Sequence, residues 1–298
     1  MKGNSYLIGA SAPCVAACLG GCSNISLLDP KGPVGVSELI VIGVAFAIML
    51  VVVIPVIVMA VWFPRRYKAS NPQGDYAPKW SYSAKIDLIV WLVPAAIVMG
   101  LGTLAWIETH KLDPFNPISA PGRPIVIDVV SLDWKWLFIY PDQQVATVNQ
   151  LELPVNVPAS FRITSDTVVT SFFIPQLGSQ IYAMPGKESR LHLLADKPGT
   201  YIGQNQQFSG RGFADMNFKV KVTTFRQFET WIQQLKRSPN ILDRAQFERL
   251  KKPDAAHPTK AYSWVEHDLF THIVHSFHSF TGKEYRAHRI KTAASEES

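Results

Sequence analysis

Leu39-Ile-Val-Ile-Gly-Val-Ala-Phe-Ala-Ile-Met-Leu-Val-Val-Val-Ile-Pro-Val-Ile-Val-Met-Ala-Val61 is a run of 23 residues without a charged side chain. A second apolar run covers residues 86–107 and carries a single acid, Asp87, next to its start. A helix rises about 1.5 Å per residue, so about 20 apolar residues cross a hydrocarbon core of about 30 Å. The sequence therefore predicts two membrane spans, residues 39–61 and 86–107, which form a transmembrane α-hairpin within residues 22–110.

The segment between the two runs is basic. It contains a single acid, Asp75, against Arg65, Arg66, Lys68, Lys79 and Lys85. Short loops rich in Lys and Arg stay in the cytoplasm. Both chain ends, and everything after the second span, are therefore expected in the periplasm of a bacterial inner (plasma) membrane.

The N-terminus has the features of an export signal. Lys2 precedes a short apolar stretch that ends in Leu19-Gly-Gly-Cys22, which resembles a bacterial lipobox. We expect residues 1–21 to be a lipoprotein signal peptide and Cys22 to carry acyl chains such as palmitate. The alternative is an apolar N-terminus that is not cleaved.

The cysteine count and the charge limit the function classes. All three cysteines, Cys14, Cys18 and Cys22, lie in this N-terminal stretch, so the rest of the chain can form neither a disulfide nor a thiolate metal site. The net charge is +6 with dispersed basic residues, whereas nucleic-acid binding needs them clustered. No nucleic-acid partner is expected.

The composition changes after Lys111. A Pro-rich linker precedes short β-type runs with regular turn signals, so residues 120–224 are expected to form an all-β sandwich. Residues 225–298 are expected to form a helical C-terminal extension. Its first helix would bury a face at helical spacing, composed of Phe225, Phe228, Trp231, Ile232 and Leu235. Its last helix carries His272, His275 and His278, which form either a metal site or, as the commoner case, a solvated face.

The segment from Gly203 to Met216, Gly-Gln-Asn-Gln-Gln-Phe-Ser-Gly-Arg-Gly-Phe-Ala-Asp-Met, resembles the copper loop of cytochrome c oxidase subunit II. That family writes Cys-Ser-Glu-x-Cys-Gly-x-x-His-x-x-Met there, with a further histidine upstream. The ligand positions of the family are occupied here by Thr170, Asn205, Ser209 and Phe213, while Gly210 and Met216 remain. A binuclear copper centre needs thiolate and imidazole donors. A loop with this spacing but without thiolate and imidazole ligands is similar to the loop of the quinol oxidase branch, as in subunit II of cytochrome bo-type ubiquinol oxidases.

Two further segments resemble this family. The run from Phe173 to Gly186, Phe-Ile-Pro-Gln-Leu-Gly-Ser-Gln-Ile-Tyr-Ala-Met-Pro-Gly, resembles its core-and-turn segment, and Asp133-Trp-Lys-Trp136 resembles its aromatic strand. The resemblance implies a cupredoxin-like Greek-key sandwich. Trp134 and Trp136 would then form the aromatic patch that lies near electron entry in the copper enzymes. Without copper, they are more simply packing aromatics.

The resemblance implies a non-catalytic subunit II of a proton-pumping quinol oxidase, with ubiquinol as the substrate of the complex. Haems and copper are expected in the partner subunit I, and no cofactor or metal is expected in this chain. The remaining partners are further membrane subunits and lipid. Asp87 matches a family carboxylate near a proton-entry pathway, although an acid at a helix N-terminus is also favoured by the helix dipole.

Two alternatives belong to other classes. One is a lipid-anchored periplasmic binding or assembly protein with a degenerate cupredoxin domain. The other is a copper-containing cytochrome c oxidase subunit, which the absence of thiols after Cys22 argues against.

Overall fold

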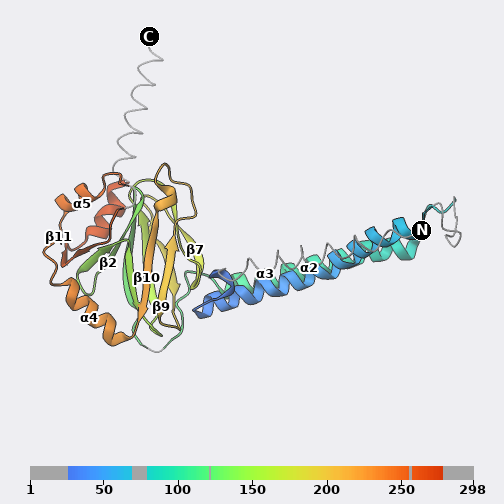
Figure 1. The fold of residues 1–298 in the computed structure, drawn as a ribbon, viewed down its shortest axis with the longest axis horizontal. Coiled ribbons are helices and arrows are strands. Elements are labelled where there is room, and N and C mark those ends of the chain that lie inside the picture. Colours follow the sequence, from blue (N-terminus) through green and yellow to red (C-terminus); the bar gives the residue numbers. More distant parts are fainter. Residues whose placement is uncertain (1–25, 69–78, 121, 255–256, 278–298) are drawn as a thin grey trace, which may run out of the picture. The chain divides into compact units, whose positions relative to one another are not determined.

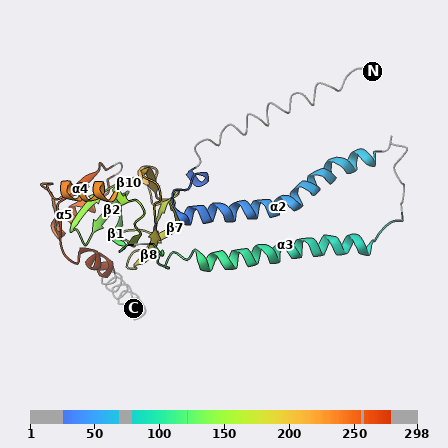
Figure 2. The ribbon, with the colours of Figure 1, turned by 90° about the horizontal axis from the view of Figure 1, so that it is seen from below.

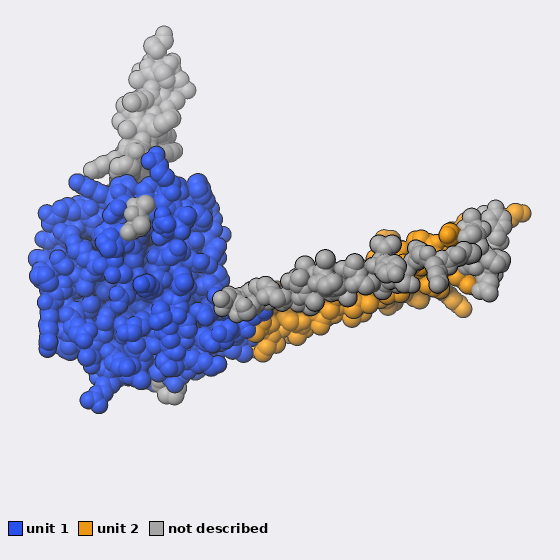
Figure 3. All heavy atoms as spheres, in the orientation of Figure 1, with its two compact units in different colours: residues 1–36, 117–298 blue, residues 37–116 orange. Residues whose placement is uncertain are grey.

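The computed structural model describes residues 26–68, 79–120, 122–254 and 257–277. The chain divides into two compact units, one formed by residues 1–36 with 117–298 and the other by residues 37–116 (Figure 3). The first unit holds a β-sandwich, and the second holds two long apolar helices. The predicted signal peptide, Cys22 and His278 lie outside the described residues.

The two helices are α2 (Pro33–Arg66) and α3 (Ala84–Lys111), and each is long and apolar enough to cross a membrane. At about 1.5 Å per residue, their 34 and 28 residues reach about 51 Å and about 42 Å. Each helix extends beyond the predicted span, because polar residues continue it at both ends. Helix α2 bends along its length (Figure 2), as expected for a helix with Pro55 in its interior.

The sandwich has two mixed sheets (Figure 1). The larger has the order β12-β3-β2-β1-β5-β8, and the smaller has the order β4-β10-β9-β6-β7. The strands are β1 (Ile125–Leu132), β2 (Lys135–Tyr140), β3 (Val145–Val148), β4 (Gln150–Pro154), β5 (Ala159–Ser165), β6 (Thr170–Ile174), β7 (Gly178–Ala183), β8 (Ser189–Leu193), β9 (Gly199–Gln204), β10 (Asn217–Thr223) and β12 (Lys260–Tyr262). Strands β1 and β5 are parallel, as are β4 and β10.

Aromatic side chains fill the space between the sheets. Trp136 from β2 meets Phe172 from β6 and Phe218 from β10 edge-on, with ring centroids 5.5 and 5.6 Å apart. Phe172 and Phe218 stack with centroids 5.2 Å apart. Aromatic pairs at such distances add to the free energy of burial. These contacts join the two sheets near the loop end described below.

The C-terminal extension covers the outer face of the larger sheet, except for its first helix, residues 225–235, whose apolar face packs into the core between the sheets. The extension consists of α4 (Phe225–Leu235), β11 (Ile241–Leu242), α5 (Arg244–Leu250), β12, β13 (Trp264–Val265) and helical residues 269–277. A second apolar cluster forms between the sheet and this extension, and includes Val130, Leu132, Leu137, Ile139, Phe247, Leu250, Tyr262, Leu269, Phe270 and Ile273. All six residues of β2 are therefore buried. Strand β10, which lies in the other sheet, keeps the alternation of a strand with one solvated face.

The predicted fold class is confirmed: two apolar helices, a cupredoxin-like sandwich and a C-terminal helix follow one another. Two details differ from the prediction. The extension also contributes a strand, because β12 pairs antiparallel with β3. Phe225 of α4 is 52% exposed, whereas the other four residues of the predicted apolar face are buried. Helix α4 begins with a capping box in which Thr224 and Gln227 bond each other's backbone N–H.

Buried polar side chains hold the extension to the sheet. The Lys135 side chain is almost fully buried, and its Nζ donates to the carbonyl of Lys252 at 2.8 Å. Burial lowers the pKa of this ammonium. Asn149 Nδ2 donates to the carbonyl of His257 at 2.8 Å. The segment before β12 is thus fixed at two points by side chains from the sheet.

Candidate functional site at the loop end of the sandwich

Two loops meet at one end of the sandwich. One joins β9 to β10, and the other joins β5 to β6. Strands β6 and β9 are antiparallel neighbours, with Phe173 opposite Gln204. The start of β6 therefore lies beside the end of β9, which brings Thr170 and Ser171 close to Asn205.

Asn205 is the centre of a buried hydrogen-bond network. Its Oδ1 accepts from three donors: Ser171 N at 2.9 Å, Ser171 Oγ at 3.3 Å and Gln207 N at 2.9 Å. Its Nδ2 donates to the carbonyl of Gln207 at 2.8 Å and to Ser209 Oγ at 3.2 Å. A buried amide with both ends bonded fixes the path of the loop.

Met216 completes this cluster. Its side chain is 1% exposed, and its sulfur lies 3.4 Å from Asn205 Nδ2 and 3.8 Å from Ser209 Oγ. The structure therefore brings Asn205, Ser209 and Met216 together.

The other two positions are bonded elsewhere. Thr170 Oγ1 donates to Ser131 Oγ at 2.7 Å, and both residues are buried. Phe213 starts the short helix η3 (Phe213–Asp215), and its ring lies 5.7 Å from the ring of Phe208. Phe208 is itself 73% exposed.

Trp134 supports the loop from the β1–β2 turn. Its φ of 61° is unusual for a residue other than glycine. Its indole Nε1 donates to the carbonyl of Ser209 at 2.9 Å. A Cβ added at Gly212 would lie 2.4 Å from the indole ring, so only glycine fits there. The strained turn thus places the indole where it holds the loop.

Trp136 has a different environment. It is fully buried in the core between the sheets, and its Nε1 has no hydrogen-bond partner among the described residues. The two tryptophans of the predicted aromatic patch therefore lie in different surroundings, one against the loop and one within the core. The positive φ of Trp134, which separates them, has no signal in the sequence.

The donor set of the loop end determines which ligands it can hold. An amide, two hydroxyls and a phenyl ring occupy the positions of the thiolates and imidazoles, and only the thioether of Met216 remains. Soft thiolate and imidazole donors hold copper, so the residues present do not fit a binuclear copper centre. No group of three or more His, Cys, Asp or Glu side chains that could hold a metal ion occurs within the described residues.

The loop end is also connected to the C-terminal extension. Lys251 Nζ lies 3.3 Å from Asp166 Oδ2, and the Asp166 side chain is 6% exposed. Burial raises the pKa of the Asp166 carboxyl despite this ion pair. The extension thus reaches the loop between β5 and β6 through one partly buried ion pair.

Asp87 lies in the first turn of α3, in the other unit. Its side chain is exposed, and its backbone N–H donates to the carbonyl of Ser83 at 3.0 Å. His272 and His275 are also exposed, on the helix of residues 269–277.

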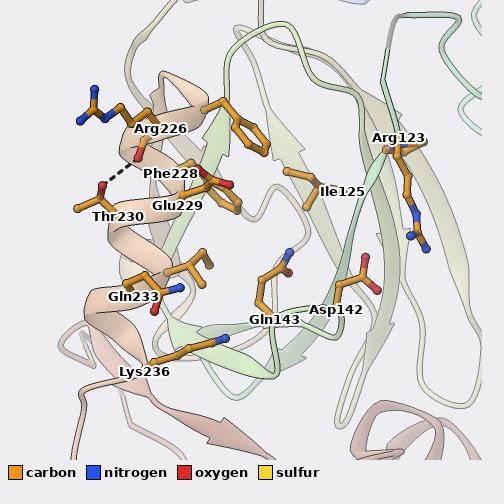
Figure 4. Close-up of a pocket in the computed structure, with 13 residues that line it drawn as sticks. Arg123, Ile125, Asp142, Gln143, Arg226, Phe228, Glu229, Thr230, Gln233 and Lys236 are labelled. Carbon is orange, nitrogen blue, oxygen red and sulfur yellow. Dashed lines mark hydrogen bonds between the residues drawn. The ribbon is translucent and has the colours of Figure 1, made fainter.

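A cavity lies elsewhere on the sandwich, between α4 and the start of β1 (Figure 4). It has a volume of about 710 Å³, and Gln143 and Asp142 line it on the side opposite α4. The Oε1 atom of Gln143 is buried without a hydrogen-bond partner in the described chain. On α4, Thr230 Oγ1 is bonded to the carbonyl of Arg226 at 2.9 Å. The cavity shares no residue with the loop end.

The chain matches two known protein families. Residues 141–223 match the family described as Cytochrome C oxidase subunit II, periplasmic domain, and residues 236–279 match the COX Aromatic Rich Motif. The first match contains the loop end, and the second covers most of the C-terminal extension. The fold and the loop together place the chain in one class of protein, the subunit II of cytochrome oxidases.

Similar proteins narrow this class. The chain is 48% identical over 259 residues to "Cytochrome bo(3) ubiquinol oxidase subunit 2" of Pseudomonas putida, covering 87% of this chain and 82% of that protein. It is 44% identical over 266 residues to "Ubiquinol oxidase subunit 2" of Acetobacter aceti, covering 89% and 86%. The solved periplasmic domain of subunit II of the Bradyrhizobium japonicum cytochrome oxidase aligns at 23% identity and a TM-score of 0.37, covering 39% of this chain and 96% of that one. The chain belongs to the family of ubiquinol oxidase subunit 2, which confirms the resemblance found in its sequence.

Proposed function

We propose that this chain is the non-catalytic subunit II of a proton-pumping quinol oxidase, which oxidises quinol to quinone and reduces oxygen to water. The observation that carries this proposal is the Asn205–Ser209–Met216 cluster in a subunit II loop. A loop filled by an amide and a hydroxyl has no donors for a copper relay from a soluble protein. A membrane-soluble donor such as ubiquinol does not need that relay.

The haems and the catalytic copper belong, in this proposal, to the partner subunit I. The proposal assigns no redox group to this chain and gives it a structural contribution. The exposed apolar faces of α2 and α3 would pack against subunit I and further membrane subunits. A Cβ added at Gly100 or Gly102 meets nothing within 4 Å among the described residues, which leaves the α3 backbone open to a neighbouring helix.

The proposed orientation follows from the basic segment between the helices. Arg65 and Arg66 end α2, and Lys85 lies in the first turn of α3. Placing this segment in the cytoplasm puts the sandwich and both chain ends in the periplasm. Export of the N-terminus agrees with lipidation at Cys22, so we propose a lipid-anchored mature chain that begins there.

Asp87 is the one residue proposed to take part in proton transfer. Its place in the first turn of α3 puts a carboxylate at the proposed cytoplasmic boundary. An exposed carboxylate at this position could collect protons for a pathway in subunit I. The alternative is that Asp87 is a solvated acid at a helix N-terminus, which would have no role toward subunit I.

The test is donor preference. The chain would be extracted gently with its bound subunits, and oxygen uptake would be compared with ubiquinol and with reduced soluble cytochrome c. We expect uptake with ubiquinol alone. Uptake from cytochrome c would contradict the absence of a relay. A chain that carries no haem protein and supports no uptake would instead be a stand-alone periplasmic binding protein.

A further inference from the structure

The run from Phe173 to Gly186 contains a turn that the loop end does not explain. Residues 174–178 connect β6 to β7, and this turn contacts the segment immediately before and within the first turn of α2. Both the turn and residues 26–36 belong to the unit that contains the sandwich. The contact is therefore internal to that unit.

Backbone hydrogen bonds hold the segment in place from two sides. Lys31 N donates to the carbonyl of Gln176 at 2.6 Å, and Gly35 N donates to the carbonyl of Leu177 at 3.2 Å. On the other side, Asp196 N donates to the carbonyl of Lys31 at 2.9 Å. The segment thus lies between the β6–β7 turn and the residues that follow β8.

The fit is too close for side chains at two glycines. A Cβ added at Gly32 would lie 2.2 Å from the carbonyl oxygen of Leu194. A Cβ added at Gly178 would lie 2.6 Å from Val34 Cγ1, and Gly178 also has a φ of +131° that glycine adopts most readily. Gly32 and Gly35 are both buried, so the segment is enclosed as well as bonded.

We propose that residues 174–178 and 194–196 form a socket for residues 31–35, and that Gly178 is its positioning residue. The socket holds the first turn of α2, which begins at Pro33, against the sandwich within one unit. It assigns the Pro175-Gln-Leu-Gly178 part of the run a role in fixing the start of α2. The inference concerns this chain alone and does not depend on the electron donor of the oxidase.

Hydrogen exchange of the full chain in detergent tests the socket. Gly178→Ala should make the amides of residues 31–36 exchange at least about tenfold faster, because overpacking displaces Val34. Peptides from β1 and β2 should keep their protection. Gly122→Ala is the matched control, since Gly122 also has a positive φ, +103°, but a Cβ there meets nothing within 4 Å.

Rescue separates positioning from general damage. Adding Val34→Gly to Gly178→Ala removes the side chain that the new methyl meets, so it should restore part of the protection of residues 31–36; the positive φ at position 178 still disfavours alanine. Unchanged exchange in Gly178→Ala, or no recovery in the double variant, would overturn the proposal. If Gly178→Ala also speeds amide exchange in β1 and β2, the socket is tested instead by Gly32→Ala, which changes the bound segment and not the turn. Unchanged exchange of residues 31–36 in Gly32→Ala would equally overturn it.

Discussion

Replacing Asn205 by alanine should destabilise the loop end more than any other single change there. The change removes the acceptor of the Ser171 N–H and both donors of the amide. Ser171 is fully buried, so its N–H cannot bond water instead, and such an orphaned group costs about 1–3 kcal/mol. Gln207 is exposed, and its groups can bond water.

The expected loss in the free energy of unfolding is therefore about 2–4 kcal/mol, since the lost bonds to Gln207 and Ser209 add about 1 kcal/mol to the orphaned N–H. Denaturant unfolding of the full chain in detergent, followed by tryptophan fluorescence, would measure it. Gln206→Ala is the control, because the Gln206 side chain is exposed, lies next to Asn205 in the sequence and makes none of these hydrogen bonds. A loss in Asn205→Ala no larger than that of Gln206→Ala would refute the reasoning.

Three further changes and one measurement on the unchanged chain have defined outcomes. Gly212→Ala should drive the Trp134 indole from the loop and shift its fluorescence, and an unchanged spectrum would contradict the close fit. Burial raises the pKa of the Glu152 carboxyl, so this carboxyl binds a proton more tightly in the folded protein than in the unfolded chain. The free energy of unfolding therefore falls as pH rises through the raised pKa. Glu152→Gln should therefore be more stable than the parent at pH 8, with an advantage in denaturant unfolding that shrinks toward pH 4; an advantage independent of pH would rule this out. Asp87→Ala should slow quinol-driven oxygen uptake with the complex still assembled, and undiminished turnover would remove it from the proton pathway. Intact-mass spectrometry should find a chain that starts at acylated Cys22, whereas a retained N-terminal methionine would exclude processing there.

The sequence predicts the large elements of the fold because they carry strong patterns. The apolar runs locate α2 and α3, yet hydropathy finds only the part that lies in hydrocarbon, so the polar ends of both helices are missed. Strand β7 has little signal in the sequence, because Gly178, Ser179 and Gln180 hide its alternation. Strand β12 has three residues, and it is a strand only because β3 offers it an edge. Tertiary context, not propensity, forms such short strands.

The sequence predicts which positions belong to the loop end, but it does not predict the contacts that their side chains make. The resemblance to the copper loop marks the positions of Asn205, Ser209 and Met216, because the spacing of the loop is preserved, and their contacts come from the structure. The bond between Thr170 and Ser131 depends on two strands far apart in sequence. The role of Trp134 depends on a positive φ that no residue pattern announces.

The extension over the larger sheet has a consequence for the order of folding. The outer face of β1 and β2 is covered by residues that are synthesised after the whole sandwich. Strand β3 likewise receives its partner β12 from more than a hundred residues downstream. Such distant pairings form slowly, and an uncovered apolar face invites aggregation until they form. During export the sandwich must therefore persist with one face uncovered until the end of the chain arrives to cover it.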